Sequence, residues 1–345
     1  MENFNTPLTE NMIYHKKYGY IKEKSLKKKL IRNDLNHTHL CVMAAIVLST
    51  LLSFALSMVF SIFAPYMLMT TGLPPYLYYL INMFGSAFTI GLPFFVYLAF
   101  RKESISEYLR FKKNPKIDSL LLVFAAVGLC MLANYPSMLI MELVEGAGLD
   151  GGAQESLAGT NAFESVLYFL TIAVFPPLFE EFAFRGVMLS TLRKHGDGFA
   201  LIVSSVAFAL MHASISTMPF ALICGFAMGY VYLRTENLWL SVLIHFINNA
   251  NATIPGILIL YLPEDLTNLI SNIVFYALIL LGVIAFIVLL VRKTLVRSEE
   301  PEVKRYISYE LSTAGKLSAY FTSVGTLAAL AVTIGMIVLS MLGMY

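Results

Sequence analysis

The segment Phe-Glu-Glu-Phe-Ala-Phe-Arg-Gly, from Phe179 to Gly186, holds the first residues that could do chemistry. Glu181 and Arg185 stand four positions apart, so on a helix their charges share one face in the favourable orientation for an ion pair. The adjacent Glu180 is rotated by about 100° and has no such local partner. An unpaired carboxylate in a low-dielectric site suits a general base working near neutral pH. The alternative is a helix end that simply surfaces in water.

Two further polar positions interrupt long apolar runs. His212 ends the segment Phe208-Ala-Leu-Met-His212 and is the only Asp, Glu, Lys, Arg or His between Gly198 and Leu233. His245 and Asn249 are four positions apart and therefore share a helix face. Such side chains are expensive in a membrane and are functional candidates by default. The alternatives are a hydrogen-bonded core histidine and an asparagine that only joins two helices.

Together these six residues form an inventory for activating water. It contains two carboxylates, one Arg, two His and one Asn, which can act as acid, base and oxyanion donors. The same set holds the ligand types that zinc prefers, with Glu180, His212 and His245 as the candidate ligands. No Ser–His–acid arrangement can be assembled from it. The residues alone therefore leave a metal-free and a metal-dependent hydrolase open.

The elements that must position these residues follow from composition. Of 345 residues, 58% are hydrophobic and only 13% are charged, which predicts a polytopic membrane protein. Disordered proteins, disulfide-rich secreted scaffolds and nucleic-acid binders are excluded. The three cysteines lie in apolar runs and are expected to be small buried hydrophobes. We predict an all-α membrane bundle of about nine transmembrane segments, at residues 40–64, 77–100, 118–141, 162–192, 199–213, 217–233, 238–258, 267–291 and 317–343. The fifth and sixth are short and could instead form a re-entrant pair.

Basic residues predict the orientation and the division of the chain. Lys and Arg gather in the first 39 residues, in Arg101–Lys116 and in the loop 292–316, which favours a cytoplasmic N-terminus. We expect a basic cytoplasmic tail (1–39), N-terminal membrane helices (40–159), a catalytic core (160–258) and C-terminal membrane helices with the cytoplasmic loop 292–316 (259–345). The run Lys16–Arg32 is expected either on the anionic inner leaflet or as a solvated tail.

At its central motifs the sequence resembles the CPBP family, the CAAX proteases and bacteriocin-processing or immunity proteins also called Abi. The family pattern is Glu-Glu-x-x-x-Arg, Phe-x-x-x-His and His-x-x-x-Asn/Asp on successive membrane helices. This chain supplies the three motifs as Glu180–Arg185, Phe208–His212 and His245–Asn249. The segment Arg234-Thr-Glu-Asn-Leu-Trp239 also looks like bacterial members, apart from Glu236, where Gly is expected. The resemblance covers roughly residues 160–255.

The resemblance implies an intramembrane endopeptidase with the core of the type II CAAX prenyl proteases. It implies that Glu180 activates water, His212 positions it, and His245 and Asn249 bind the oxyanion. Glu181 and Arg185 would support the site. The resemblance leaves zinc dependence open. We favour a glutamate-type mechanism without a cofactor, because four side chains can do the work without an ion.

The expected substrate is a membrane-associated peptide or protein, either CAAX-like or a bacteriocin or leader peptide. The expected location is the bacterial plasma membrane, with the lipid bilayer and no nucleic acid as partner. One alternative is a bacteriocin-immunity or binding protein of the same fold without turnover. Another is a proton-coupled transporter, since buried Glu and His also form proton relays, but the repeated halves typical of transporters are not visible.

Overall fold

The computed structural model describes residues 12–15, 17–70, 75–102, 104–112, 117–150, 161–295 and 311–342. Parts of four predicted non-helical regions, at 1–11, 71–74, 151–160 and 296–310, lie outside these residues. A short antiparallel hairpin, β1 (Met12–His15) and β2 (Gly19–Lys22), precedes the helices. Apart from an isolated bridge between Phe111 and Asn237, the other regular elements of the described chain are helices, as the apolar composition predicts.

The helices that lead up to the central motifs are α1 (Glu23–Thr70), α2 (Pro75–Ser86), η1 (Ala87–Gly91), α3 (Leu92–Arg101), α4 (Ile105–Tyr108), α5 (Ile117–Leu132) and α6 (Asn134–Gly146). The motif-bearing helices and those after them are α7 (Ala162–Phe169), η2 (Leu170–Val174), α8 (Phe175–Glu181), η3 (Phe182–Leu189), α9 (Ser190–Leu192), η4 (Arg193–His195), α10 (Asp197–Met211), α11 (Met218–Thr235), α12 (Leu238–Leu258), α13 (Glu264–Val291), α14 (Thr313–Phe321) and α15 (Val324–Met341). Each of the nine predicted ranges contains helix.

Seven helical stretches of the described chain are long and apolar enough to cross a membrane, rather than nine. The two predicted segments outside this set are α10 and α12. Helix α10 has 15 residues, or about 22 Å at 1.5 Å per residue, which is shorter than a hydrocarbon core of about 30 Å. Helix α12 is long enough, but its polar residues lower its hydropathy. These two helices carry His212, at the C-cap of α10, and both residues of the third motif.

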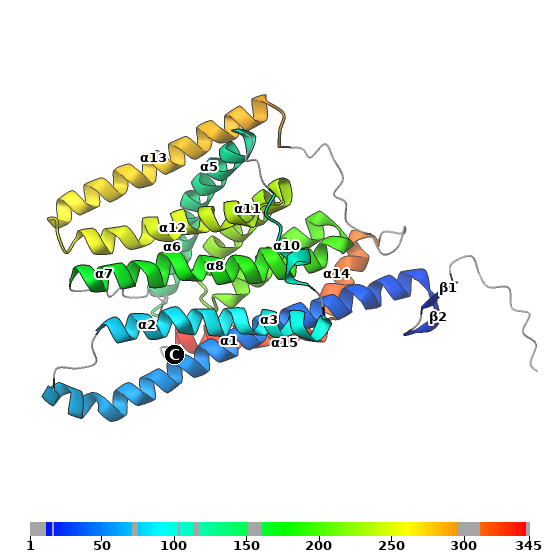
Figure 1. Cartoon of the computed structure of the whole chain (residues 1–345), viewed down its shortest axis with the longest axis horizontal. Coiled ribbons are helices and arrows are strands. Elements are labelled where there is room, and N and C mark those ends of the chain that lie inside the picture. Colours follow the sequence, from blue (N-terminus) through cyan, green and yellow to red (C-terminus); the bar gives the residue numbers. More distant parts are fainter. Residues whose placement is uncertain are drawn as a thin grey trace, which may run out of the picture.

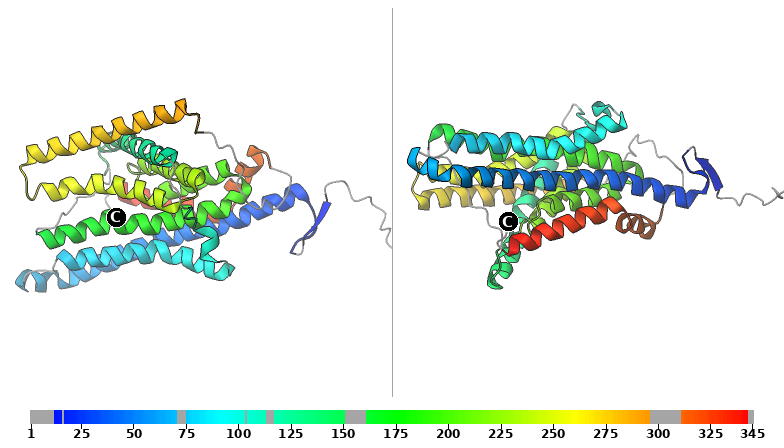
Figure 2. Two further views of the ribbon diagram at one scale, coloured as in Figure 1. Left: turned by 45° about the horizontal axis from the view of Figure 1, so that its top comes forward. Right: turned by 90° about the horizontal axis from the view of Figure 1, so that it is seen from below.

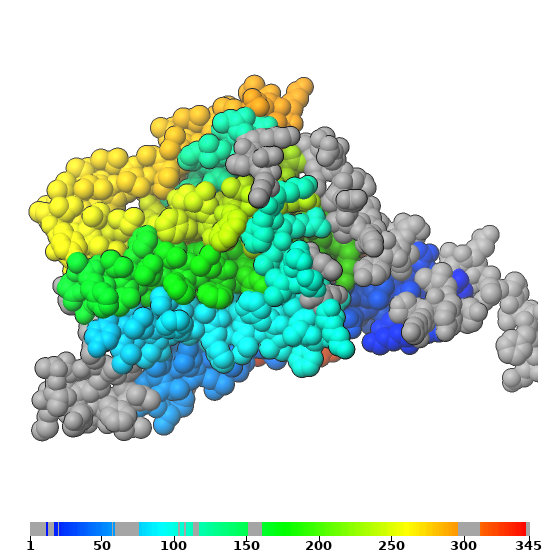
Figure 3. Space-filling view, viewed as in Figure 1, coloured from blue at the N-terminus to red at the C-terminus, as the bar shows by residue number. Residues whose placement is uncertain are grey.

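The long helices run side by side, with α13 along one edge and α1 along the other (Figure 1). In the space-filling view the surfaces of α13, α12, α7–α8 and α2–α3 follow one another across the molecule (Figure 3). Large apolar side chains are exposed along these helices; on α13 they include Leu269, Ile273, Tyr276, Leu280 and Ile284. Exposed apolar surface of this extent is typical of contact with lipid.

Helix α1, near the N-terminus, packs along α14 and α15, which lie near the C-terminus (Figure 2). The Asn36 side chain accepts hydrogen bonds from the Ser323 hydroxyl (2.7 Å) and the Gly325 amide (3.0 Å). Lys28 donates to Ser318 at 2.7 Å. Helix α1 begins at Glu23 rather than at residue 40, and the residues before position 40 gain partners on α14 and at the start of α15.

Two glycines let α5 and α13 approach each other closely. A Cβ atom at position 282 would lie 2.5 Å from the Gly128 Cα, and one at position 128 would lie 2.7 Å from the Gly282 Cα. Both contacts are shorter than van der Waals separation, and both meet backbone, which cannot rotate away. The α5–α13 contact therefore requires glycine on both helices, the arrangement of small residues that lets membrane helices pack.

Glu236 stands where the family resemblance predicts Gly, and the structure gives the reason that a side chain is tolerated. Its φ of 49° is left-handed and caps α11, a conformation that favours Gly. Its carboxylate pairs with Arg110 (3.1 Å), Lys112 (3.0 Å) and Arg193 (3.2 Å). Burial raises the pKa of this carboxyl, but the hydrogen bond from Lys112 and the charges of Arg110 and Arg193 outweigh burial and lower it to about 2. The ion pairs thus compensate for the backbone conformation.

We expect Gly282→Ala to lower the stability of the protein by about 1–3 kcal/mol, because the added methyl group overpacks the α5–α13 contact. The matched control is Gly335→Ala, since a Cβ at that position meets no atom within 4 Å. The control should be neutral or gain up to about 1 kcal/mol from helix propensity. Unfolding midpoints in one detergent check the prediction, and equal shifts for the two variants would contradict it.

Glu236→Gln should lower stability at neutral pH and change its pH dependence. The folded pKa of about 2 lies below the ordinary value of 4.5, so the ionised carboxylate stabilises the folded state above pH 4.5. That contribution is lost as the pH falls from 4.5 towards 2. The advantage of the wild type over Glu236→Gln should therefore shrink in this window, as measured by unfolding at a series of pH values. The exposed Glu142→Gln is the control.

Candidate active site

The two adjacent carboxylates lie where an α-helix changes to a π-helix. Glu180 and Glu181 end α8, and the π-helical η3 starts at the next residue. A π-helix widens the turn and shifts the register of the side chains that follow, and it is frequent at functional sites. Glu180, Glu181 and Arg185 are all buried, so this is not a helix end that surfaces in water.

Glu181 is the centre of a buried ion cluster that joins three helices. Its Oε1 accepts hydrogen bonds from Arg185 Nη1 (2.7 Å) and His245 Nδ1 (2.9 Å). Arg185 also donates from Nη2 to the Gly225 carbonyl at 3.1 Å. The ion pair predicted from the four-residue spacing is confirmed, and the same carboxylate orients the imidazole of His245 on α12. This cluster ties η3 to α11 and α12.

Phe208, the aromatic residue of the second motif, lies among the polar residues. The Arg185 guanidinium lies over its ring, 4.5 Å from the centroid. Its ring also meets the rings of His212 and His245 edge to face, with centroids 4.9 and 5.9 Å away. A cation over an aromatic face and edge-to-face ring pairs are both favourable. Phe208 therefore provides the apolar surface against which the polar groups are held.

The hydrogen bonds of the two histidines determine which nitrogen carries the proton. The carbonyl of Phe208 can only accept, so His212 Nδ1, at 2.8 Å, donates and Nε2 is the free acceptor of the neutral ring. His245 Nδ1 likewise donates to the Glu181 carboxylate. Its Nε2 lies 3.8 Å from Glu180 Oε2, which is too long for a direct hydrogen bond. A water molecule in the adjoining cavity that contacts both atoms from one side would satisfy both.

A small polar cavity of 80 Å³ collects the motif residues. It is lined by Glu180, Phe208, His212, His245 and Asn249, together with Cys130, Phe220, Cys224, Met228 and Asn248. Within the described residues, Glu180 Oε2 is buried without a hydrogen-bond partner. The cavity is polar and large enough for a water to bind there. Of the six predicted site residues, four line the cavity, while Glu181 and Arg185 lie behind it.

Three residues that line the cavity were not predicted from the sequence: Asn248, Cys130 and Cys224. Asn248 is buried, lines the cavity and donates to Asn249 Oδ1 at 3.2 Å. It follows His245 by three positions, so the helical period that singled out Asn249 also places Asn248 on that face. Cys130 comes from α5, outside the motifs, and no sequence pattern connects it to the site. The expectation that the cysteines are buried is confirmed.

Asn249 also supplies a backbone hydrogen bond that is missing in the helix that carries the carboxylates. Its Nδ2 donates to the Ile172 carbonyl at 3.0 Å. The residues that would donate to this carbonyl in an α-helix or a π-helix are Pro176 and Pro177, and neither has an N–H. Asn249 thus joins two helices, as one sequence-based alternative proposed, while its side chain also borders the cavity. One of its two amide protons remains for another acceptor.

The candidate zinc ligands do not gather into a metal site. Among the residues that the structure describes, no group of three or more His, Cys, Asp or Glu side chains is arranged to hold a metal ion. The Nδ1 bonds of His245 and His212, to Glu181 and to a backbone carbonyl, leave both Nε2 atoms open, an orientation that metal-binding histidines also have. As arranged, however, the described side chains of Glu180, His212 and His245 do not converge on a common metal position, and no step of the proposed chemistry passes through an ion.

Comparison with known proteins gives a family match that covers this site and a curated relative. Residues 162–251 match the family described as type II CAAX prenyl endopeptidase Rce1-like. The chain is also 28% identical over 104 residues to "Putative membrane peptidase YdiL" of Bacillus subtilis, a match that covers 30% of this chain and 43% of the relative. The chain thus spans less than half of this relative's length. No solved structure gives a significant match.

Asn249→Ala should lower the stability of the protein by about 1–3 kcal/mol, because it leaves the Ile172 carbonyl without a donor in lipid. Asn251→Ala on the same helix is the matched control. The measurement is the unfolding midpoint of both variants in one detergent. An unchanged midpoint for Asn249→Ala would show that this side chain has no structural role and would contradict the prediction.

Proposed function

We propose, on the basis of the match of residues 162–251 to the Rce1-like type II CAAX prenyl endopeptidase family, that the protein is an intramembrane endopeptidase of the glutamate type. The observation that carries the proposal is the buried cavity in which Glu180 faces His245 across 3.8 Å, with His212 beside them. A water bound in this cavity has Glu180 as an acceptor for its proton and two imidazoles that orient it. This is the arrangement that general-base hydrolysis needs.

In the proposed reaction Glu180 takes a proton from water as the water oxygen attacks the carbonyl carbon of the scissile peptide bond. The second hydrogen of that water stays on its oxygen and donates a hydrogen bond to His212 Nε2, which the Nδ1 bond to Phe208 leaves open. The tetrahedral intermediate then collapses, the C–N bond breaks, and Glu180 returns its proton to the leaving amine. Glu180 therefore acts first as base and then as acid.

The oxyanion of the intermediate needs hydrogen-bond donors beside the reacting carbon. In this proposal they are Nε2 of His245 in its protonated form and the remaining amide protons of Asn249 and Asn248. Glu181 stabilises the positive charge on His245 because it already accepts the Nδ1 proton at 2.9 Å. Arg185 pairs with the same oxygen of Glu181 at 2.7 Å. Preorganised donors of this kind are a large contribution to catalysis in water-poor sites.

The proposed substrates are peptides or proteins held at the membrane, because the cavity lies among helices whose outer faces are apolar. CAAX-like carboxyl termini and bacteriocin or leader peptides are the classes to test. The proposed location is the bacterial plasma membrane, with the N-terminus in the cytoplasm. The basic segments at 17–32, 101–112 and 292–293 would then lie on the cytoplasmic side.

Glu180→Gln should reduce peptide cleavage by about 10²- to 10⁴-fold, because an amide cannot accept the proton of water. The unfolding midpoint should change little, since the substitution keeps the shape of a side chain whose Oε2 has no hydrogen-bond partner in the described structure. The assay uses purified protein and a panel of membrane-anchored peptides, and Glu142→Gln, at an exposed position, is the control.

The same assay with and without a strong chelator tests the metal-free mechanism. Cleavage that survives chelation but is lost in Glu180→Gln supports it. Cleavage that is lost on chelation and restored by zinc would contradict it and make His212 and His245 ligands. Unchanged turnover by Glu180→Gln would refute the role of this residue as base.

A further inference from the structure

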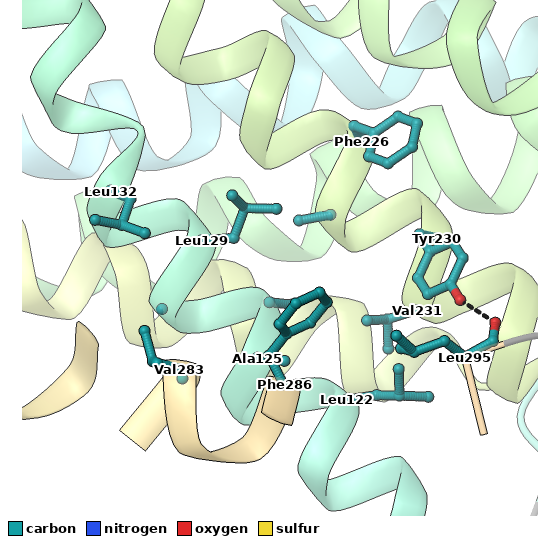
Figure 4. Close-up of a pocket in the computed structure, with 14 residues that line it drawn as sticks. Leu122, Ala125, Leu129, Leu132, Phe226, Tyr230, Val231, Val283, Phe286 and Leu295 are labelled. Carbon is teal, nitrogen blue, oxygen red and sulfur yellow. Dashed lines mark hydrogen bonds between the residues drawn. The ribbon is translucent and has the colours of Figure 1, made fainter. Parts of the chain in front are cut away.

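A second cavity lies between α5, α11 and α13, with a volume of 470 Å³ and an almost entirely apolar lining (Figure 4). Its walls include Leu122, Leu129, Leu132, Phe226 and Phe286. It is distinct from the candidate active site. The two cavities share α5 and α11 but no residue, because the active site uses other faces of these helices.

The length of this apolar cavity matches one leaflet of a bilayer. Its α5 wall runs from Leu122 to Leu132, which is about 15 Å of helix. The hydrocarbon core of a bilayer is about 30 Å thick, so one acyl chain occupies about half of it. The space is therefore long enough for the chain of a single lipid, and its volume lies in the range of ordinary ligand sites.

An incompletely paired guanidinium stands beside one end of the cavity. Arg234 follows the wall residue Tyr230 by one helical turn, on the same face of α11. Arg234 Nη2 donates to the Thr294 carbonyl, and the Tyr230 hydroxyl donates to the carbonyl of Leu295, another wall residue (Figure 4). The remaining Arg234 nitrogens Nε and Nη1 are buried and have no hydrogen-bond partner within the described residues.

Among the described residues, the charge at this end of the cavity is positive. Arg292 and Lys293 follow α13 directly and are exposed. Arg292 pairs with Asp118 at the start of α5 (2.7 Å), so Asp118 offsets one of the three cations that the described chain places here. An anion that reached Arg234 would satisfy two buried donors at once, and the planar guanidinium suits the two oxygens of a phosphate. Basic pockets between membrane helices bind lipid headgroups in this way.

We propose that this cavity binds one anionic phospholipid, with an acyl chain along α5 and the phosphate on Arg234. The apolar lining recognises the chain, and the unpaired Nε and Nη1 atoms select the headgroup. This lipid would also fill the space beside the Gly128–Gly282 contact and so support the docking of α13. The proposal does not depend on the peptidase reaction, because no residue of the candidate active site takes part.

The test is native mass spectrometry of the full-length protein in a mild detergent, titrated with palmitoyl-oleoyl phosphatidylglycerol or with the corresponding phosphatidylcholine. The wild type should take up one phosphatidylglycerol about tenfold more tightly than phosphatidylcholine. Arg234→Gln should lose this preference, whereas Lys293→Gln, an exposed cation nearby, should keep it. Ala125→Leu, at a partly buried wall position, should fill the cavity and reduce the binding of both lipids.

Unfolding midpoints measured in parallel show that each variant is folded. Equal binding of the two lipids by the wild type would overturn the proposal. So would a preference for phosphatidylglycerol that survives Arg234→Gln or is lost equally in Lys293→Gln. Competition by millimolar inorganic phosphate separates the two sources of the anion: displacement of the lipid by phosphate alone would show that the chain contributes nothing, and would contradict a site for a whole lipid.

Discussion

The buried carboxylate of Glu181 is the constraint on which the site depends. A charge in a low-dielectric interior is tolerated only when it is paired and hydrogen-bonded, and removal of one partner leaves the other uncompensated. Glu181 Oε1 meets this requirement with Arg185 and His245, and Arg185 in turn reaches the Gly225 backbone and the face of Phe208. Because the Glu181 carboxylate needs these partners, it holds Arg185 and His245 in fixed positions. The cluster therefore orients the His245 imidazole, which faces Glu180.

A second constraint comes from the backbone, because a membrane offers no water to an unpaired carbonyl. Pro176 and Pro177 cannot donate a backbone hydrogen bond, so the Ile172 carbonyl lacks a donor within its own helix. The side-chain amide of Asn249, on α12, donates to it instead. Helix packing also limits the size of the side chain at position 225. A Cβ atom there would lie only 3.2 Å from the Ser205 Cα, so glycine allows α10 and α11 to pack closely. The Gly225 carbonyl accepts the hydrogen bond from Arg185.

Much of this site could be predicted from spacing, because helical periodicity and the cost of charge in lipid are local rules. They identified the Glu181–Arg185 pair and the four cavity residues Glu180, His212, His245 and Asn249. These local rules could not predict the features that depend on tertiary packing. The place of Cys130 depends on the packing of α5, and the start of α1 depends on partners on α14 and α15. The count of nine spans exceeds the seven stretches that length and composition mark as spanning, because α10 and α12, which carry part of the polar site, are shorter or less apolar than those seven.

The packing of α1 against α14 and α15 has a consequence for biogenesis. Asn36 and Ser323, which hydrogen-bond each other, are 287 residues apart in the chain. A translocon delivers helices in order, so α1 enters the membrane long before its partners are made, and native pairs of such high sequence separation form late. Until then the buried faces of α1, including the imidazole of His39 and the hydroxyl of Thr38, must be shielded by other helices, by lipid or by an insertion factor.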